Sequence, residues 1–410
     1  MKKFFALLLS LAMVLALVAC GQKDPTPDTP DTPDDPQTKV EYKVAMITDY
    51  GDITDQSFNQ TTYEACKAFA EDNSIEFSYF KPAGDNTADR VAMIEKAVDE
   101  GFNVIVMPGY AFGGAIVEAA PEFPDVKFIA LDVAAGDLLE TAVAKAGEAY
   151  DYTPENWDLN KYVDMSNVYC AVYQEELCGY MAGYAAVKLG YKNLGFLGGM
   201  SVPAVVRYGY GFVQGVDAAA ADLGLTDVKL NYIYGGQFFG DADITAVMDT
   251  WYQGGTEVVF ACGGGIYTSA VDAAKKVGAK VIGVDVDQAG VIANYAGVDG
   301  MTVTSAMKGL YPATYDTLTD VIVNGNWEKY VGKIETLGLV SGTDPEANYV
   351  QIPMGDGTQW SDSFTQDDYK AMVKDMFDGK ITVSNNTSSD VSVADFATVI
   401  TVDDQGSIKG

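Results

Sequence analysis

Short runs of consecutive apolar residues alternate with helical stretches along most of the chain, and this alternation limits the folds open to it. The first apolar runs are residues 44–47, 76–80, 104–107 and 127–131. Helical spacing of apolar residues lies between them, at 57–72 and 87–100. Apolar strands without polar alternation are typical of parallel sheets that helices cover on both faces. The sequence therefore predicts an α/β fold with parallel sheets.

The same order of strands and helices starts again later in the chain. Strands are predicted at 194–197, 229–234, 257–261 and 280–284, with a helix from about 205 to 221. Two successive α/β runs predict two similar lobes with a cleft between them. Ligands of such sheets bind beyond the carboxyl ends of the strands. The residues that directly follow each strand are therefore the candidate binding residues.

The segments that follow the predicted strands share carboxylates, amides, aromatic rings and glycine backbone. The candidates are Asp49, Phe58, Asn59, Asp132, Gly263 and Asp285. Such a lining suits a small ligand with several hydroxyl groups and a flat ring. Simpler interpretations stay open for some neighbours, because Asp55 or Ser57 can cap a helix and residues 263–265 can form a tight turn.

The overall composition argues against several functions. The 410 residues include no histidine, and 58 acidic residues against 26 Lys and Arg give a formal net charge of -32. Histidine is the commonest general base and metal ligand, so we expect no enzyme, no metal and no cofactor, although a carboxylate or lysine mechanism stays open. Nucleic acid is not an expected partner, because phosphate binding needs clustered basic residues.

The N-terminus predicts an exported, lipid-anchored protein. Lys2 and Lys3 precede an uncharged apolar run at 4–18, and Leu17-Val18-Ala19-Cys20 follows. A basic start, a short apolar segment and small residues indicate a signal peptide at 1–20, and the run is too short to span a membrane well. A cysteine after Leu-Val-Ala resembles the bacterial lipobox, in which Cys20 is diacylated and becomes the mature N-terminus.

Residues 21–40 repeat Asp-Thr-Pro and predict a disordered acidic tether. The remaining cysteines are Cys66, Cys170, Cys178 and Cys262. All four stand in apolar stretches without a CxxC pair, which favours buried free thiols over a metal site. A bridge between Cys170 and Cys178 stays open.

Six strings carry a family resemblance. They are residues 55–60 (DQSFNQ), 175–183 (EELCGYMAG), 195–200 (GFLGGM), 282–288 (IGVDVDQ), 305–308 (SAMK) and 378–383 (DGKITV). The chain resembles, from about residue 44 to 383, the basic membrane protein (BMP) family of bacterial lipoproteins, which includes the purine nucleoside receptors of ABC importers. The resemblance implies the periplasmic-binding-protein type I fold, with two Rossmann-like lobes joined by three hinge crossings. We expect lobe 1 at 41–172 plus 288–335, and lobe 2 at 173–287 plus 336–410.

The resemblance also implies roles for single residues. Phe58 would stack on a purine base, and Asn59 and Asp132 would bond to the edges of that base. Asp285 would hold the ribose hydroxyls, with Lys308 close by and Asp49 completing the polar wall. A second stacking ring is expected from the other lobe, with Phe260 and Tyr267 as candidates. The protein would then be a monomer on the extracellular face of the cell membrane that delivers purine nucleosides to an ABC permease.

Two segments depart from the family pattern. The stretch at 136–165 is longer than relatives carry, and it either covers the cleft mouth or decorates the first lobe. The string Gly-Gly-Gly-Ile-Tyr at 263–267 stands where the family usually has Gly-Gly-Thr-Gly, which bears on the ligand more than on the fold. The alternatives are a sugar or autoinducer-type ligand on the same fold, or a ligand-sensing lipoprotein that contacts a signalling receptor.

Overall fold

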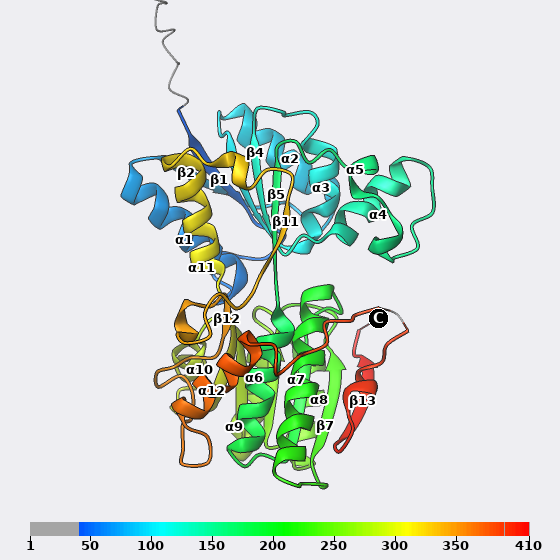
Figure 1. Ribbon diagram of the computed structural model, residues 1–410, viewed down its shortest axis with the longest axis vertical. Helices are drawn as coiled ribbons and strands as arrows, with labels where there is room; N and C mark the ends of the chain where they lie inside the picture. The colour runs from blue at the N-terminus through cyan, green and yellow to red at the C-terminus, as the bar shows by residue number, and fades with distance from the viewer. Residues whose placement is uncertain (1–40, 389, 410) are drawn as a thin grey trace, which may run out of the picture. The chain divides into compact units, whose positions relative to one another are not determined.

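The computed structural model describes residues 41–388 and 390–409 (Figure 1), and Tyr42–Gly410 forms one compact unit. The predicted leader at 1–20 with its Cys20, and the predicted tether at 21–40, lie outside the described residues. Within the described ranges, no helix is both long and apolar enough to cross a membrane.

Six parallel strands form the first sheet, in the order β11-β5-β4-β3-β1-β2. They are β1 Lys43–Ile47, β2 Glu76–Phe80, β3 Val104–Pro108, β4 Lys127–Leu131, β5 Val168–Tyr173 and β11 Ile334–Leu337. The helices of this lobe are α1 Phe58–Asn73, α2 Thr87–Asp99, α3 Gly113–Ala119, α4 Ala135–Lys145, α5 Leu159–Tyr162 and α11 Leu310–Leu318. Val44 and Met46 pack in the core cluster with α1, whereas Ala45 and Ile47 pack in the cluster with α2 and α3. Burial on both faces explains why the apolar run of β1 is continuous.

Seven strands form the second sheet, in the order β12-β10-β9-β8-β6-β7-β13, and only β12 is antiparallel to its neighbour. They are β6 Asn193–Gly198, β7 Lys229–Tyr234, β8 Val258–Cys262, β9 Lys280–Asp285, β10 Thr302–Lys308, β12 Val350–Gln351 and β13 Thr401–Ser407. The helices are α6 Glu175–Lys188, α7 Pro203–Asp222, α8 Ala242–Gln253, α9 Tyr267–Val277, α10 Ala289–Ala296 and α12 Gln366–Phe377. Short 3-10 or π turns are η1 Tyr110–Phe112, η2 Pro154–Asn156, η3 Thr319–Val323, η4 Trp327–Lys329, η5 Pro345–Ala347 and η6 Val393–Phe396. The predicted α/β fold with parallel sheets in two lobes is confirmed.

Helices α6 and α7 pack backbone against backbone, and this close approach positions residues of the cleft. A Cβ at Gly179 would overlap the carbonyl oxygen of Tyr208, and a Cβ at Gly211 would overlap that of Glu176. Glycine at both positions lets the two helices approach this closely. The string EELCGYMAG thus places the start of α6 beside the second and third turns of α7.

Within the described residues, the chain crosses between the two sheets three times. The crossings follow β5, β10 and β11, and lead to α6, α11 and β12 respectively. The predicted lobe boundary at residue 288 is therefore displaced. Residues 302–308 form β10, which pairs with β9 in the second sheet, so the chain returns to the first lobe only after Lys308.

The stretch at 136–165 forms part of α4, a loop and α5 on the first lobe (Figure 1). Tyr150 packs against Tyr152 and Trp157, and Trp157 packs against Tyr162, with ring centroids 5.2–5.7 Å apart. These aromatic side chains therefore form a small cluster of their own. Cys66, Cys170, Cys178 and Cys262 are buried free thiols, so the possible bridge between Cys170 and Cys178 is not formed.

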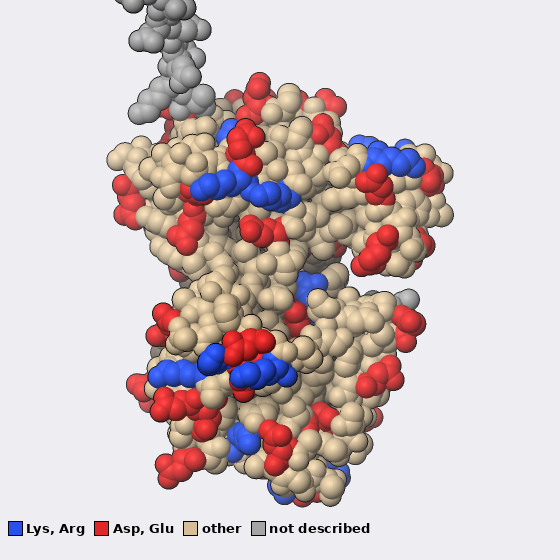
Figure 2. All heavy atoms as spheres, viewed as in Figure 1, with Lys and Arg blue, Asp and Glu red and all other residues tan. Residues whose placement is uncertain are grey.

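Acidic side chains are spread over the face shown in Figure 2, with Lys and Arg in small groups among them. This view shows no continuous basic surface of the kind that binds phosphate backbones.

Candidate ligand-binding site

A cavity of about 140 Å³ lies at the carboxyl ends of the strands and is lined by residues of both lobes. Seven of the eight predicted ligand-binding residues line it: Asp49, Phe58, Asn59, Asp132, Gly263, Asp285 and Lys308. No residue of 136–165 is among those that line it. That stretch is therefore an addition to the first lobe that does not contribute to the cavity wall.

Asp132 and Asp285 occupy equivalent places in the two lobes. Asp132 directly follows β4, and Asp285 is the last residue of β9. Their φ angles are 59° and 64°, in the left-handed region that non-glycine residues rarely adopt. Such backbone strain persists where the surrounding structure enforces it, and it clusters at ligand sites. Both lobes thus turn a carboxylate into the cavity at the end of a buried strand.

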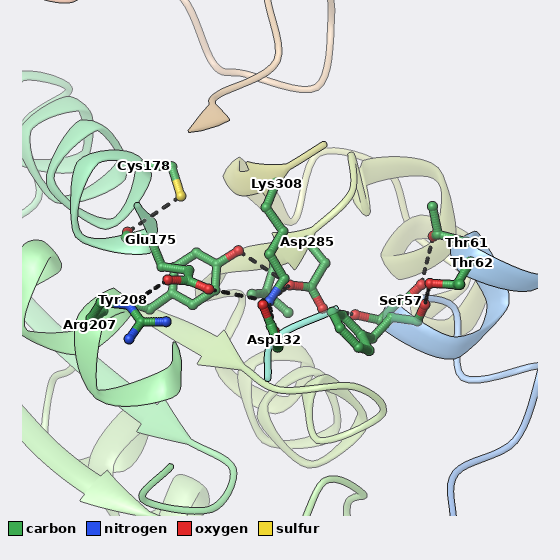
Figure 3. Close-up of polar contacts among 12 residues, drawn as sticks. Ser57, Thr61, Thr62, Asp132, Glu175, Cys178, Arg207, Tyr208, Asp285 and Lys308 are labelled. Carbon is green, nitrogen blue, oxygen red and sulfur yellow. Dashed lines mark hydrogen bonds and ion pairs between the residues drawn. The ribbon is translucent and has the colours of Figure 1, made fainter. Parts of the chain in front are cut away.

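Lys308 joins the two lobes through three buried carboxylates (Figure 3). Its ammonium lies 2.5 Å from Asp132 Oδ2, 3.6 Å from Glu175 Oε1 and 3.7 Å from Asp285 Oδ1. Burial would lower the pKa of Lys308, but the three carboxylates outweigh burial and raise that pKa above its ordinary value. Lys308 therefore remains charged and compensates acids from both sides of the cavity.

Asp285 is held by two hydroxyl groups as well as by Lys308. Ser57 Oγ donates to Asp285 Oδ2 at 2.5 Å, and Tyr208 Oη donates to Asp285 Oδ1 at 3.2 Å. Ser57 belongs to the first lobe and Tyr208 to the second, so these bonds fix the carboxylate from both sides. Each carboxylate oxygen has two lone-pair sites, which leaves Asp285 able to accept further donors.

Phe58 is the first residue of α1, and its ring faces the Lys308 ammonium. Lys308 Nζ lies 4.6 Å from the ring centroid, within the range of a cation–π contact. Asp55 organises the start of this helix, because its carboxylate accepts the backbone N–H groups of Ser57, Asn59 and Gln60 at 2.9–3.1 Å. Burial raises the pKa of Asp55, and these bonds counter that rise. The capping interpretation of Asp55 is confirmed.

Unpaired acceptor oxygens mark the polar wall of the first lobe. Asp49 Oδ1 accepts the N–H groups of Tyr50 and Gly51 at 2.7 Å and the Asn59 amide at 3.3 Å. Burial raises the pKa of Asp49 against these bonds. By contrast, Asn59 Oδ1 and Asp132 Oδ1 are buried and accept no hydrogen bond from the described chain. Buried acceptors are usually satisfied, so these two atoms suit a ligand that presents N–H or O–H donors.

Glu175 extends the charge network behind the cavity, and the sequence indicated no role for it beyond its place in a family string. Its Oε2 accepts from Arg207 Nε at 2.6 Å. Burial raises the pKa of Glu175, with Arg207 opposing that rise most strongly. Because Glu175 opens α6 at the first crossing, the network links the cavity to the connection between the lobes.

Phe260 does not line the cavity, which corrects the prediction of a stacking role for it. It is fully buried and packs against Phe196, Tyr208 and Phe212, with ring centroids 5.3–5.9 Å apart. Its side chain points from the middle of β8 toward α7, into the core. Tyr267, the second candidate, is 6% exposed, packs in another core cluster and is also absent from the lining.

Phe238 is half-buried and lines the cavity from the second lobe, together with Tyr208 at 2% exposure and Phe239 at 56% exposure. A Cβ at Gly199 would overlap the Phe238 ring, and one at Gly263 would come within 2.8 Å of it. Gly263 also has a φ of 145°, so glycine suits this position on both counts. In the sequence, two adjacent phenylalanines follow the predicted strand at 229–234, and this pair could have identified Phe238 as a candidate.

The chemistry of the cavity favours an uncharged polar ligand. The described residues that line it include four carboxylates and one cation, Lys308. No group of three or more Cys, Asp or Glu suited to hold a metal ion occurs in the described chain. Carboxylate repulsion disfavours a phosphorylated ligand, whereas aromatic rings and unpaired acceptors suit a flat ring with donor groups.

Comparisons with known proteins agree with this architecture. The model of a family described as "ABC transporter substrate-binding protein PnrA-like" (Bmp) matches residues 42–343. The ABC transporter nucleoside-binding protein BmpA of Lactococcus lactis subsp. cremoris is 25% identical over 92% of this chain and 96% of its own. An uncharacterized lipoprotein of Pyrococcus abyssi is 26% identical over 74% of this chain and 69% of its own.

A solved ABC transporter solute-binding protein of Aeropyrum pernix shares the fold, with a TM-score of 0.63 at 18% identity, covering 85% of this chain and 95% of that one. The family match spans both lobes and every residue that lines the cavity. The chain therefore belongs to the Bmp family of PnrA-like substrate-binding proteins of ABC transporters, which is a family of binding proteins and not of enzymes.

Proposed function

We propose that this protein captures purine nucleosides outside the cell, as a lipid-anchored receptor, and delivers them to an ABC importer. The observation that carries the proposal is the shared lining of one cavity. Phe58 and Phe238 come from opposite lobes, and the same cavity holds carboxylates with acceptor capacity left over. Base–aromatic stacking contributes about 1–3 kcal/mol per base. The name of the Lactococcus lactis relative, a nucleoside-binding protein, supports the same ligand class.

In this proposal each wall of the cavity recognises one part of the ligand. Phe58 and Phe238 stack on the base, while Asn59 Oδ1 and Asp132 Oδ1 accept hydrogen bonds from its edge. Asp285 accepts the ribose hydroxyls. Asp49, Gly263 and Lys308 complete the wall: Asp49 orients Asn59, Gly263 makes room for Phe238, and Lys308 compensates the carboxylates.

The cavity volume of about 140 Å³ lies below the range of about 300–1,000 Å³ that small-molecule pockets usually have. We therefore expect the lobes to separate for the nucleoside to enter and then to close around it. The three crossings after β5, β10 and β11 would serve as the hinge.

A titration of the purified protein with a panel of ligands tests the ligand class. We expect guanosine, inosine and adenosine to bind, and guanosine 5′-monophosphate and free ribose to bind at least about tenfold more weakly, because an unpaired buried polar group or a repelled phosphate costs more than about 1.4 kcal/mol. Chromatography should recover each nucleoside intact. Binding of ribose alone with equal affinity, or hydrolysis of the nucleoside, would overturn the proposal.

The lipid anchor on Cys20 is tested separately. The Cys20→Ala variant should move from the membrane fraction to the medium, because two or more acyl chains are needed for stable anchoring. Mass spectrometry of the parent protein should find the acyl chains on Cys20. Unchanged membrane retention of the variant would refute the anchor without touching the ligand class.

A further inference from the structure

The loop at 235–241, which carries Phe238, is held on two sides. On the cavity side it packs against glycines, and the carbonyl oxygen of Phe238 accepts the Gly265 N–H at 2.8 Å. On the other side, Lys409 Nζ donates to Gln237 Oε1 at 2.9 Å and also pairs with Asp241. Gln237 and Asp241 flank the two phenylalanines, so one lysine side chain ties both ends of the aromatic stretch.

Lys409 belongs to a segment that is itself firmly attached, and residues 398–409 are called the strap below. Asp217 on α7 accepts the N–H groups of residues 398, 399 and 400 at 2.8–3.2 Å. The strap then adds β13 to the edge of β7, and the Ile408 N–H donates to the Tyr234 carbonyl at 2.8 Å. The strap thus follows β7 to the point where the loop with Phe238 begins.

The contact between the strap and the loop is close. Gly236 has a φ of 78°, and a Cβ on it would come within 2.8 Å of the Lys409 side chain and backbone. Asp241 has a second task, because its other oxygen accepts the Ile244 N–H and caps α8. Lys409 therefore connects the strap, the loop and the start of α8.

We propose that the strap acts as a positioning element for ligand recognition, in which Lys409 holds the 235–241 loop so that Phe238 stays against the cavity. The matched family region ends at residue 343, so the strap lies beyond the part of the chain that the family description covers. A loop fixed in its binding conformation loses less conformational entropy when ligand binds. Lys409 touches no ligand in this account and acts only through Phe238. The ligand arm of the test below rests on the proposed function.

Hydrogen exchange on the ligand-free protein tests the first half of the proposal. The Lys409→Gln variant should exchange the amides of 235–241 and of Gly265 about two- to fivefold faster, the range expected for a partly exposed ion pair. Lys409→Arg keeps the charge and should match the parent. Lys276→Gln is the matched control. Lys276 on α9 pairs with Asp249 at 2.7 Å, and Asp249 belongs to the helix α8 that Asp241 caps but lies away from its N-terminus. Equal exchange in all four proteins, or an equal rise in the control, would overturn the proposal.

A guanosine titration tests the second half. Lys409→Gln should raise the Kd for guanosine about two- to fivefold, mainly through faster dissociation, and Lys409→Arg should restore it. In a Phe238→Ala background the same Lys409→Gln change should produce no further loss, because the lysine acts through that ring. Additive losses would show that Lys409 acts elsewhere and would overturn the proposal. Absence of guanosine binding to the parent would instead refute the proposed function, and the exchange experiment would still decide the role of the strap.

Discussion

At the scale of single residues, the cavity is organised by charges that compensate one another out of water. Lys308 is 5% exposed and faces carboxylates from the end of β4, the start of α6 and the end of β9. Removing one partner of such a network leaves a buried charge without compensation, which is strongly destabilising. The sequence predicted Lys308 near the ligand but gave no indication of Glu175 as a third acid, because the spatial neighbours of a buried charge do not follow from its position in the chain.

Glu176 gives this network a measurable pH dependence. Burial, followed by the charge of Glu175, raises the pKa of Glu176 from 4.5 to about 7. Between pH 4.5 and about 7, the native protein therefore keeps a proton on Glu176 that the unfolded chain has released. The contribution of this proton to stability is fully present below about pH 4 and is lost as the pH rises through about 7.

The Glu176→Gln variant cannot bind or release this proton. The free energy of unfolding of the parent, relative to that of the variant, should therefore fall by about 2–3 kcal/mol between pH 5 and pH 8. Urea unfolding of both proteins across this pH range measures the difference. Parallel pH profiles would show that Glu176 ionises in the folded protein as it does in the unfolded chain.

At the scale of elements, the sequence predicted the bounds of several strands and missed other elements. Strands β2, β4 and β7 have the predicted bounds. Strand β4 has the continuous apolar run of a strand that is covered on both faces, whereas β2 lies at the edge of its sheet with only Phe80 buried. Strand β13 was not predicted, since its residues TVDDQGS are mostly exposed at the edge of the sheet. Residues 302–308, which form β10, were placed in the wrong lobe, because the sequence of a strand does not indicate which sheet it joins.

The sequence predicted Phe260 where Phe238 lines the cavity, and this error has a similar cause. Along β8, Phe260 packs in the cluster with α7, whereas Val259 and Ala261 pack in the cluster with α8 and α9. All five residues of this strand are apolar or Cys, so the sequence does not reveal which side chains point where. The sequence indicated no role for the loop after β7, although its Phe238 and Phe239 line the cavity.

The packing of this loop against glycine gives a prediction at the same scale. The Gly199→Ala variant places a methyl group in the volume of the Phe238 ring and should displace that ring from the cavity. Guanosine affinity should fall roughly tenfold, the loss expected when one base stack is disrupted. Gly290→Ala on α10 is the control, because open space surrounds that position. Equal affinity of both variants for guanosine would remove Phe238 from the site.

At the scale of the whole molecule, the proposed function requires the two lobes to contribute different halves of the recognition. The first lobe would supply Phe58, Asn59 and Asp132 at the base, and the second would supply Asp285 at the sugar and Phe238 as the opposing ring. A ligand that bridges these groups favours the closed arrangement of the lobes by its differential affinity. Solution scattering should therefore report a smaller radius of gyration with saturating guanosine than without it, and an unchanged curve would contradict closure.

The most direct test of the account separates the two halves of the ligand by calorimetric titration. Guanosine and 2′-deoxyguanosine are titrated into the parent, Asp285→Ala and Phe58→Ala proteins. The parent should bind the deoxynucleoside at least about tenfold more weakly, because a charged buried acceptor that loses a donor costs more than about 1–3 kcal/mol. Asp285→Ala should weaken guanosine and reduce this discrimination, whereas Phe58→Ala should weaken both ligands by a similar factor. Equal binding of both ligands by the parent, or equal loss of discrimination in both variants, would contradict the account.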